Sequence, residues 1–262
     1  MLPILRAEWL KTKRTSVRAL TFGLPVLFAL LLVAYFALRG KTEAVQLTVF
    51  AAFFESWTTL VIPFGAGLLP GLMVHQEALA GQFQNLLSTV RPRTSMFWGK
   101  LFLIALLASL STLIATVTLL VAFRFTMGMA LAGPVFLLAA AWAAMSTLPL
   151  LMFHYWISLA WGLGASIGIG SIGALIAGLM ATSLGDKIWP FVPWAWPVRL
   201  TIWTGVYLPD FSSRDGVPYT LFDHRVWVEL NKGLLPFAVF LIAMLIGGML
   251  WFNRWEGRTV QE

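Results

Sequence analysis

The chain has 262 residues, of which 59% are apolar and only 11% are charged, and it contains 13 Trp and 20 Phe. A soluble domain carries about 25% charged residues, so this composition excludes a water-soluble globule and predicts a protein whose solvent is lipid. The net charge of +7 comes from basic residues that flank apolar runs, which favours anionic lipid headgroups over nucleic acid as the binding partner.

The first 18 residues are predicted to form an amphipathic helix on the cytoplasmic face of the membrane. Leu2, Leu5 and Trp9 recur at helical spacing, while nearby basic side chains lie off that stripe. An unstructured basic tail is the alternative. The apolar run that follows is longer than the core of a secretory signal and lacks a cleavage site of small residues, so we do not expect a cleavable signal peptide.

Six apolar segments are long enough to span a bilayer, whose core of about 30 Å requires about 20 residues per helix. They are residues 19–38, 50–74, 101–123, 134–153, 157–181 and 234–252. The sequence therefore predicts an all-α integral membrane protein, in which residues 1–262 form a single transmembrane domain. Only His154, Tyr155 and Trp156 separate the fourth and fifth spans, which predicts a tight hairpin there.

The basic cluster before the first span indicates the orientation, because Lys and Arg are enriched on the cytoplasmic side. The N-terminus is therefore expected in the cytoplasm, and six spans return the C-terminus to the same side. Residues 75–100 then form a cytoplasmic loop, and residues 182–233 form an external segment.

The cytoplasmic loop is predicted to contain a short helix with one apolar face, because Leu79, Phe83, Leu86 and Leu87 follow helical spacing. Pro92 ends this helix, since the residue before a proline is pushed away from helical angles. A helix held between two spans can pass a push from a soluble partner into the membrane. A helix that rests on lipid headgroups is the alternative.

The external segment contains the run WPFVPWAWP, with Trp189, Trp194 and Trp196. Trp favours the headgroup level, so we expect this run in the outer interface, where its Trp residues are candidates for gating or substrate contact. An aromatic belt with no other role is the alternative. Glu55, near the outer end of the second span, is a further candidate, because a carboxylate at membrane depth is costly. Its alternative role is an interfacial anchor.

Two short motifs match nucleotide-binding patterns but lie in the wrong context. GIGSIG, residues 168–173, matches the dinucleotide pattern inside an apolar span and not at a strand-to-helix turn. We therefore expect Gly164, Gly168 and Gly170 to let another helix approach closely. GKT, residues 40–42, follows a span and lacks the first glycine of a phosphate-binding loop.

Enzymatic chemistry is not expected in this chain. It has no Cys, and its three His fall in separate predicted loops, so we expect no metal site, no cofactor and no catalytic residue. If ATP drives this protein, another chain must bind it.

The stretch HQEALAGQFQNLLSTVRPRTSMFWGKL, residues 75–101, resembles the signature of type-2 ABC exporter permeases. The matching positions are Glu77, Gly81, Leu86, Leu87, Pro92, Arg93, Gly99 and Lys100. With ESWTTL upstream and WAWP before the last span, the chain is similar more narrowly to the permeases of lantibiotic immunity transporters.

The resemblance implies a bacterial plasma-membrane complex of two permease chains, alike or different, and two ATPase subunits that bind ATP and Mg²⁺. It implies that the N-terminal helix and the loop helix dock onto the ATPases, with coupling residues Glu77, Gly81, Phe83, Leu86 and Leu87. An immunity permease would expel a cationic amphiphilic peptide. The alternatives are an exporter of another drug or lipid-like substrate and a non-transporting sensor or scaffold. A secondary transporter has little support, because no second half mirrors Glu55.

Overall fold

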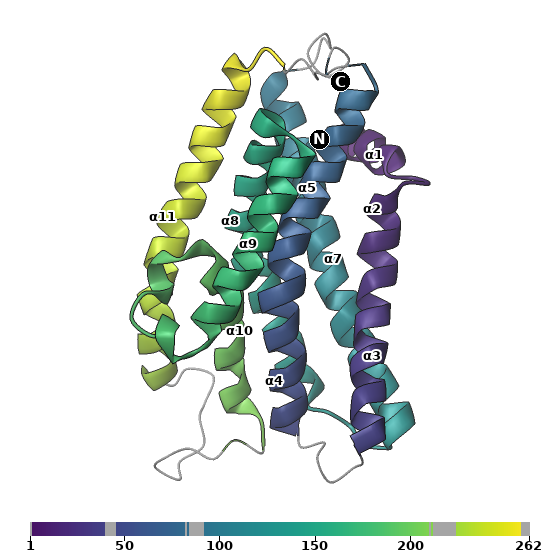
Figure 1. The fold of residues 1–262 in the computed structure, drawn as a ribbon, viewed down its shortest axis with the longest axis vertical. Coiled ribbons are helices and arrows are strands. Elements are labelled where there is room, and N and C mark those ends of the chain that lie inside the picture. The colour runs from purple at the N-terminus through teal and green to yellow at the C-terminus, as the bar shows by residue number, and fades with distance from the viewer. Residues whose placement is uncertain are drawn as a thin grey trace.

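The computed structural model describes residues 2–39, 46–81, 83, 92–209, 211 and 224–257. Throughout these ranges the regular structure is helical, with no β-strand. The longer helices are α1 (Leu2–Lys11), α3 (Leu24–Arg39), α4 (Gln46–Ser56), α5 (Ile62–Leu79), α7 (Arg93–Met127), α8 (Gly133–Trp161), α9 (Leu163–Ala181) and α11 (His224–Arg254). Figure 1 shows them as an elongated bundle.

Six continuous helical segments within the described ranges are long and apolar enough to span a membrane, which confirms the predicted fold class. They are Ser16–Arg39, Gln46–Leu79, Arg93–Met127, Gly133–Trp161, Leu163–Ala181 and Val226–Arg254. The helix α1 and the last turns of α11 lie at the same end of the bundle (Figure 1), as an even number of spans requires. We call this the N-terminal end, and the opposite end the far end.

The hairpin between the fourth and fifth spans differs from the prediction. The α8 helix continues through His154 to Trp161, and the chain turns at Gly162. That residue has φ 90°, which glycine adopts without strain. The turn predicted at residues 154–156 is therefore wrong, and His154 is fully buried in the bundle.

Two segments of π-helix interrupt the first two spans. The first, η1 (Ala19–Gly23), lies between α2 (Ser16–Arg18) and α3, and the second, η3 (Trp57–Val61), joins α4 to α5. The apolar periodicity of these spans gives no sign of them.

The external segment forms a compact set of short helices against α8, α9 and α11. In chain order these are η4 (Ser183–Gly185), η5 (Trp189–Phe191), η6 (Pro193–Ala195), α10 (Trp196–Ile202) and η7 (Trp203–Tyr207). With α11 they bury a second apolar cluster, separate from the larger core between the first four spans. The α11 helix begins at His224, so residues 224–233 belong to this helix and not to the external segment.

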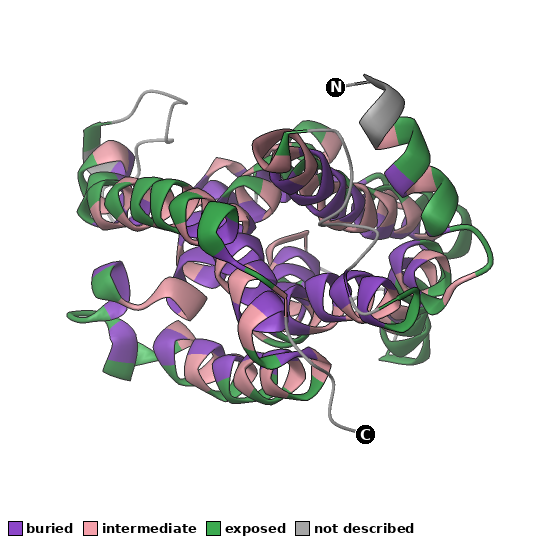
Figure 2. Cartoon of the chain, turned by 90° about the horizontal axis from the view of Figure 1, so that it is seen from above, coloured by how far each residue is buried: buried purple, intermediate pink, exposed green. Residues whose placement is uncertain are grey.

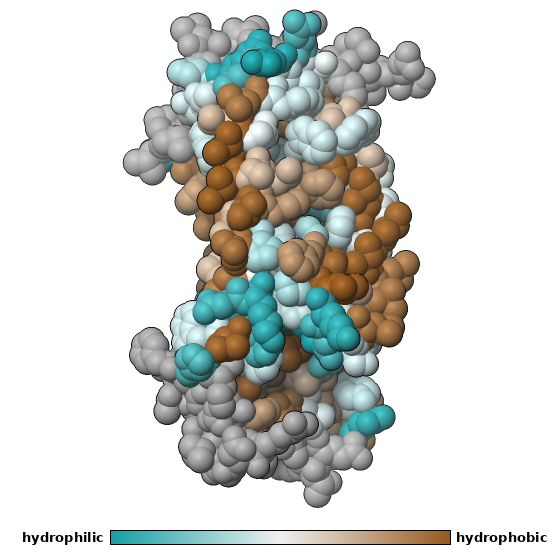
Figure 3. All heavy atoms as spheres, turned by 90° about the vertical axis from the view of Figure 1, so that its left-hand side faces the viewer, coloured by the Kyte–Doolittle hydropathy of each residue, from teal (hydrophilic) through white to brown (hydrophobic). Residues whose placement is uncertain are grey.

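The surface of the bundle is apolar, as a lipid solvent requires. Leu27, Leu31, Leu175, Leu235 and Leu250 are each about half exposed or more. Figure 2 shows exposed and intermediate residues along the outer faces of the helices, with buried residues turned inwards. Figure 3 shows apolar side chains over the middle of one face, with hydrophilic groups towards either end. Hydrophobic residues on this surface contact lipid tails, which are as apolar as they are, so their exposure alone does not indicate a docking site.

Candidate functional site

Four charged side chains form a closed ring at the N-terminal end of the bundle. Lys100 Nζ, on α7, lies 2.7 Å from Glu77 Oε1 and 3.0 Å from Glu8 Oε2. Lys11 Nζ, on α1, lies 2.6 Å from Glu77 Oε1 and 2.7 Å from Glu8 Oε1. Each lysine therefore bridges both carboxylates, and the ring connects α1 to the second and third spans.

The ring is buried on one side and open on the other. The side chain of Lys100 is 3% exposed and those of Glu8 and Glu77 are 8% exposed, whereas that of Lys11 is 47% exposed. Buried charges are costly unless they are paired and hydrogen-bonded. Two carboxylates and two ammonium groups give a net charge of zero, so the loss of any one member would leave an unbalanced charge in the ring.

Lys11 is the exposed member and lies outside the spans. Partial burial disfavours its charged form, but hydrogen bonds and charge attraction from Glu77 and Glu8 outweigh this effect. The pKa of Lys11 is therefore raised above its ordinary value, and its charge is retained across the physiological pH range.

The N-terminal helix is oriented by this ring as well as by its apolar residues. Glu8 and Thr12 face the bundle and are buried, whereas Leu10 is 64% exposed. Arg18 donates to the carbonyl oxygen of Trp9 at 3.0 Å and lies over its indole ring at 4.7 Å. The apolar stripe alone did not reveal the role of Glu8. An available signal was that it is the one acidic residue among the basic ones that precede the first span.

Phe83 is placed differently from the expected docking face. It is 1% exposed, and its ring packs edge-on against Trp255 at 4.9 Å between centroids. The α5 helix ends at Leu79, and both Gly81 and Phe83 have positive φ, at 129° and 66°. The chain thus turns directly after α5, and Phe83 packs against Trp255 at the end of α11.

Other expected coupling residues fall into three groups. Glu77 lies in the last turn of α5 and is buried in the ring, so it is not exposed to a docking partner. Leu79 is 74% exposed beside it. Leu86 and Leu87 lie outside the described residues.

The motif residues Pro92 and Arg93 begin the third span. Pro92 is the N-cap of α7. Arg93 donates to the carbonyl oxygens of Asn253 at 3.1 Å and of Trp255 at 3.0 Å. These carbonyls lie at the end of α11, where a cation satisfies groups that have no helical partner. Arg93 therefore fixes the last span against the third, next to Phe83.

At the far end, Glu55 lines a second feature, a cavity of about 360 Å³. Leu47, Phe50 and Glu55 of α4 line one side, and Arg199 and Trp203 of the external segment line the other. Glu55 is exposed, and its side chain makes no hydrogen bond or ion pair within the described part of the chain.

Glu55 and Glu77 are separated by 22 residues of continuous helix, about 33 Å. This distance is close to the thickness of a bilayer core, about 30 Å.

Arg199 does not neutralise Glu55, because its guanidinium is engaged elsewhere. It donates to the carbonyl oxygens of Met180 at 2.7 Å and Thr182 at 2.6 Å, and it lies 2.9 Å from Asp186 Oδ1. Through these two carbonyl oxygens, Arg199 caps the C-terminal end of α9. The cavity therefore presents Glu55 as its one unpaired charge among the described lining residues.

The three candidate Trp residues do not line this cavity. Trp196 is 1% exposed and donates to the carbonyl oxygen of Pro190 at 2.9 Å, and Trp189 is 3% exposed against α11. Trp194 packs on Gly173, where an added Cβ would lie 2.1 Å from its Nε1. Trp203 lines this cavity together with Glu55, and sequence reasoning did not single it out.

The close helix contact within this chain is between α5 and α9. A Cβ added at Gly170 would lie 2.8 Å from the carbonyl oxygen of Pro63, and one at Gly67 would lie 2.5 Å from that of Ser166. The hydroxyl of Ser166 donates to the carbonyl oxygen of Gly67 at 2.7 Å across the same contact. Gly164 and Gly168 are exposed, and an added Cβ at either would meet nothing within 4 Å.

No group of three or more His, Asp or Glu side chains that could hold a metal ion occurs in the described part of the chain.

The family model described as ABC-2 family transporter protein matches residues 4–181, more than half of the chain. That range contains most of α1, the four residues of the ring and the first five spans. Comparisons with curated proteins and with solved structures give no match.

Proposed function

Because the chain belongs to the ABC-2 family of transporter proteins, it is a multi-pass membrane subunit of an ABC transporter, and we propose that it expels a cationic amphiphilic peptide. A lantibiotic in a self-immunity system is the substrate proposed. The chain is not itself catalytic. In this proposal two separate ATPase subunits bind ATP and Mg²⁺, and a second permease chain, identical or homologous, completes the channel.

The proposed orientation places both termini, α1 and the ring on the cytoplasmic side of a bacterial plasma membrane. The observation that carries the coupling mechanism is the ring, because it makes α1, the end of α5 and the start of α7 move together. A push by the ATPases against α1 or the loop after α5 would therefore tilt the second and third spans as a unit. Such a push shifts the spans between two arrangements only if it favours one of them.

The contact with the ATPases is assigned in this proposal to Leu79, Leu86 and Leu87, with Gly81 providing the turn between them. Leu79 supports the assignment, since a leucine that is 74% exposed at a charged membrane boundary is available to a partner. Glu77 and Phe83 act from inside the chain, through the ring and through Trp255.

Substituting Leu79 with Asp is expected to abolish co-purification of the ATPase while leaving the permease folded, because the side chain is exposed and buries little within the chain. The measurement is the amount of ATPase that remains with the tagged permease in mild detergent. The matched control is Leu184→Asp, at a leucine that is 71% exposed in the external segment. ATPase retention by Leu79→Asp equal to that of the control would contradict the assigned contact.

The same purification tests the transporter reading itself. A stoichiometric ATPase with a phosphate-binding loop supports it. A permease that protects cells from peptide without any such ATPase would instead be a sensor or scaffold.

Glu55 is the proposed contact for the positive charge of the substrate. Its carboxylate is unpaired within the described chain and lines a cavity that Trp203 also lines. In the proposed orientation it lies near the outer boundary of the membrane. A cationic amphiphile gathers at that level, so its charge and its apolar part would meet the carboxylate and the apolar lining of the cavity together.

Substituting Glu55 with Gln is therefore expected to weaken the export of a cationic peptide several-fold and to leave export of a neutral amphiphile unchanged. The measurement is removal of each fluorescent compound from cells at matched expression. Glu229→Gln is the control, because Glu229 is an acidic residue of α11 that pairs with Lys232 and lies outside the cavity. An equal loss for both compounds would overturn the proposed role of charge.

Gly164 and Gly168 belong to the proposed interface with the second permease chain. Both lie on a face of α9 that no described residue of this chain covers closely. The proposal is that small residues there let a helix of the other chain approach.

A further inference from the structure

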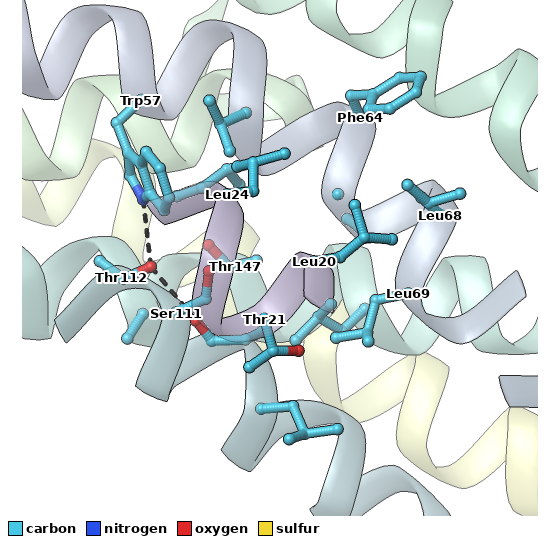
Figure 4. A pocket seen from close by; sticks show the side chains of 18 residues that line it. Leu20, Thr21, Leu24, Trp57, Phe64, Leu68, Leu69, Ser111, Thr112 and Thr147 are labelled. Carbon is cyan, nitrogen blue, oxygen red and sulfur yellow. Dashed lines mark hydrogen bonds between the residues drawn. The ribbon is translucent and has the colours of Figure 1, made fainter. Parts of the chain in front are cut away.

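A second cavity, of about 90 Å³, lies within the membrane-spanning part of this chain. One wall comes from η1 and the start of α3, the opposite wall from η3 and α5, and the floor from α7 and α8. In Figure 1 the first and second spans stand apart with α7 behind them, and Figure 4 shows the side chains that converge between them.

Both π-helical segments of the described chain contribute to this one cavity. Leu20 and Thr21 belong to η1, and Trp57 and Val61 belong to η3. A π-helical turn is rare, and it occurs frequently at functional sites. Two such turns in facing walls of the same cavity indicate that the cavity is a specific feature of this fold.

The lining of the cavity is suited to an uncharged hydrocarbon chain. Leucine, isoleucine, valine and alanine side chains make up most of it, and no lining residue carries a formal charge. Trp57 Nε1 donates to Thr112 Oγ1 at 3.2 Å (Figure 4), and Thr147 donates to the carbonyl oxygen of Ala143 at 2.6 Å. These polar groups are satisfied within the protein, so they present their apolar atoms to the cavity.

The lining of the cavity runs furthest along the second span. There it extends from Trp57 to Leu69, 12 residues apart, which is about 18 Å of helix. Leu24 and Phe64, at its edge, are each more than one-third exposed on the surface that faces lipid tails.

We propose that this cavity binds an acyl chain of a membrane lipid, inserted between the first and second spans. A cavity of about 90 Å³ is too small for a whole peptide and holds only a short part of an acyl chain, so the rest of that chain would lie in the surrounding lipid. The absence of formal charge in the lining excludes a charged headgroup. This proposal does not depend on the identity of the exported substrate.

The test uses the full chain reconstituted in phosphatidylglycerol vesicles that contain lipid with a photoreactive group in mid-chain, without any transported compound. After irradiation, we expect labelling of Leu68 and Ser111, which line the cavity, well above that of Leu150, which is fully buried in the core. Labelling of Leu68 and Ser111 at the level of Leu150 would overturn the proposal. So would labelling that appears only after an amphiphilic peptide is added, because the occupant would then be the substrate.

A variant that fills the cavity provides the second arm. Gly65 lines the cavity, and a Cβ added there would meet nothing within 4 Å. Gly65→Phe is therefore expected to reduce labelling of Leu68 and Ser111 several-fold, while labelling of Leu250 on the lipid-facing side of α11 stays unchanged. Gly247→Phe is the matched control, at an exposed helical glycine with open space around it and outside the cavity. Equal labelling of the cavity in both variants would contradict the proposed site, and the wild-type pattern tests it even if Gly65→Phe fails to fold.

Discussion

Replacing Lys100 with Met is expected to reduce the free energy of unfolding by about 3–5 kcal/mol, the usual cost of removing one partner from a buried ion pair. Lys100 is 3% exposed and contacts both Glu8 and Glu77. Without its ammonium group the two buried carboxylates carry a net negative charge that Lys11 alone cannot balance. The measurement is the denaturant-induced unfolding of the purified permease in detergent.

Two further variants make this result specific. Lys232→Met removes a lysine that is 51% exposed and pairs with Glu229 three residues earlier, and exposed pairs contribute only about 0–1 kcal/mol. The double variant Lys100→Met/Glu77→Gln restores a neutral ring and is expected to regain part of the lost stability. If Lys100→Met were no more destabilising than Lys232→Met, the ring would not hold α1 to the spans.

Replacing Gly170 with Val is expected to separate the second and fifth spans, at a cost of about 3 kcal/mol, the upper end of the range for overpacking. The first added carbon would already lie 2.8 Å from the carbonyl oxygen of Pro63, which is backbone and cannot rotate away. Separation would also break the hydrogen bond from Ser166 to Gly67, a further loss of about 1 kcal/mol. The measurement is again unfolding in detergent, together with transport in cells.

Gly168→Val provides the control on the same helix. Gly168 is two residues from Gly170, but an added Cβ there meets open space. Its effect on unfolding of the single chain is expected to be small, and any loss of transport without loss of stability would indicate a contact with the second permease chain. Equal destabilisation by the two variants would contradict the close α5–α9 contact.

Much of the architecture was predictable because a bilayer constrains it strongly. Only a helix satisfies its own backbone groups in lipid, and only about 20 apolar residues reach across. The six spans follow from these two rules, and their ends differed from prediction mainly where apolar helices continue past the membrane boundary, as α5 does to Leu79 and α8 does to Trp161. The turn at Gly162 was missed because the aromatic and polar residues at 154–156 looked like a boundary.

The candidate site was predictable only in part. The signature around Glu77 and Lys100 marked the correct region, but the sequence did not indicate that both would be buried and joined through Glu8. Phe83 has the spacing of an exposed helical face, yet the turn after α5 places it against Trp255.

By itself, the sequence determined that this protein is helical, spans the membrane six times and carries the signature of its family, since these properties depend on composition and on short runs of residues. The tertiary structure decided which side of each helix faces a neighbour. The α9 helix shows why, because it is apolar all round and lipid provides no contrast of polarity by which to recognise its inner face. Only packing distinguishes Gly170, in contact with α5, from Gly168, which faces outwards. The same holds for the ring, whose four charges come from three helices and meet only after those helices have packed.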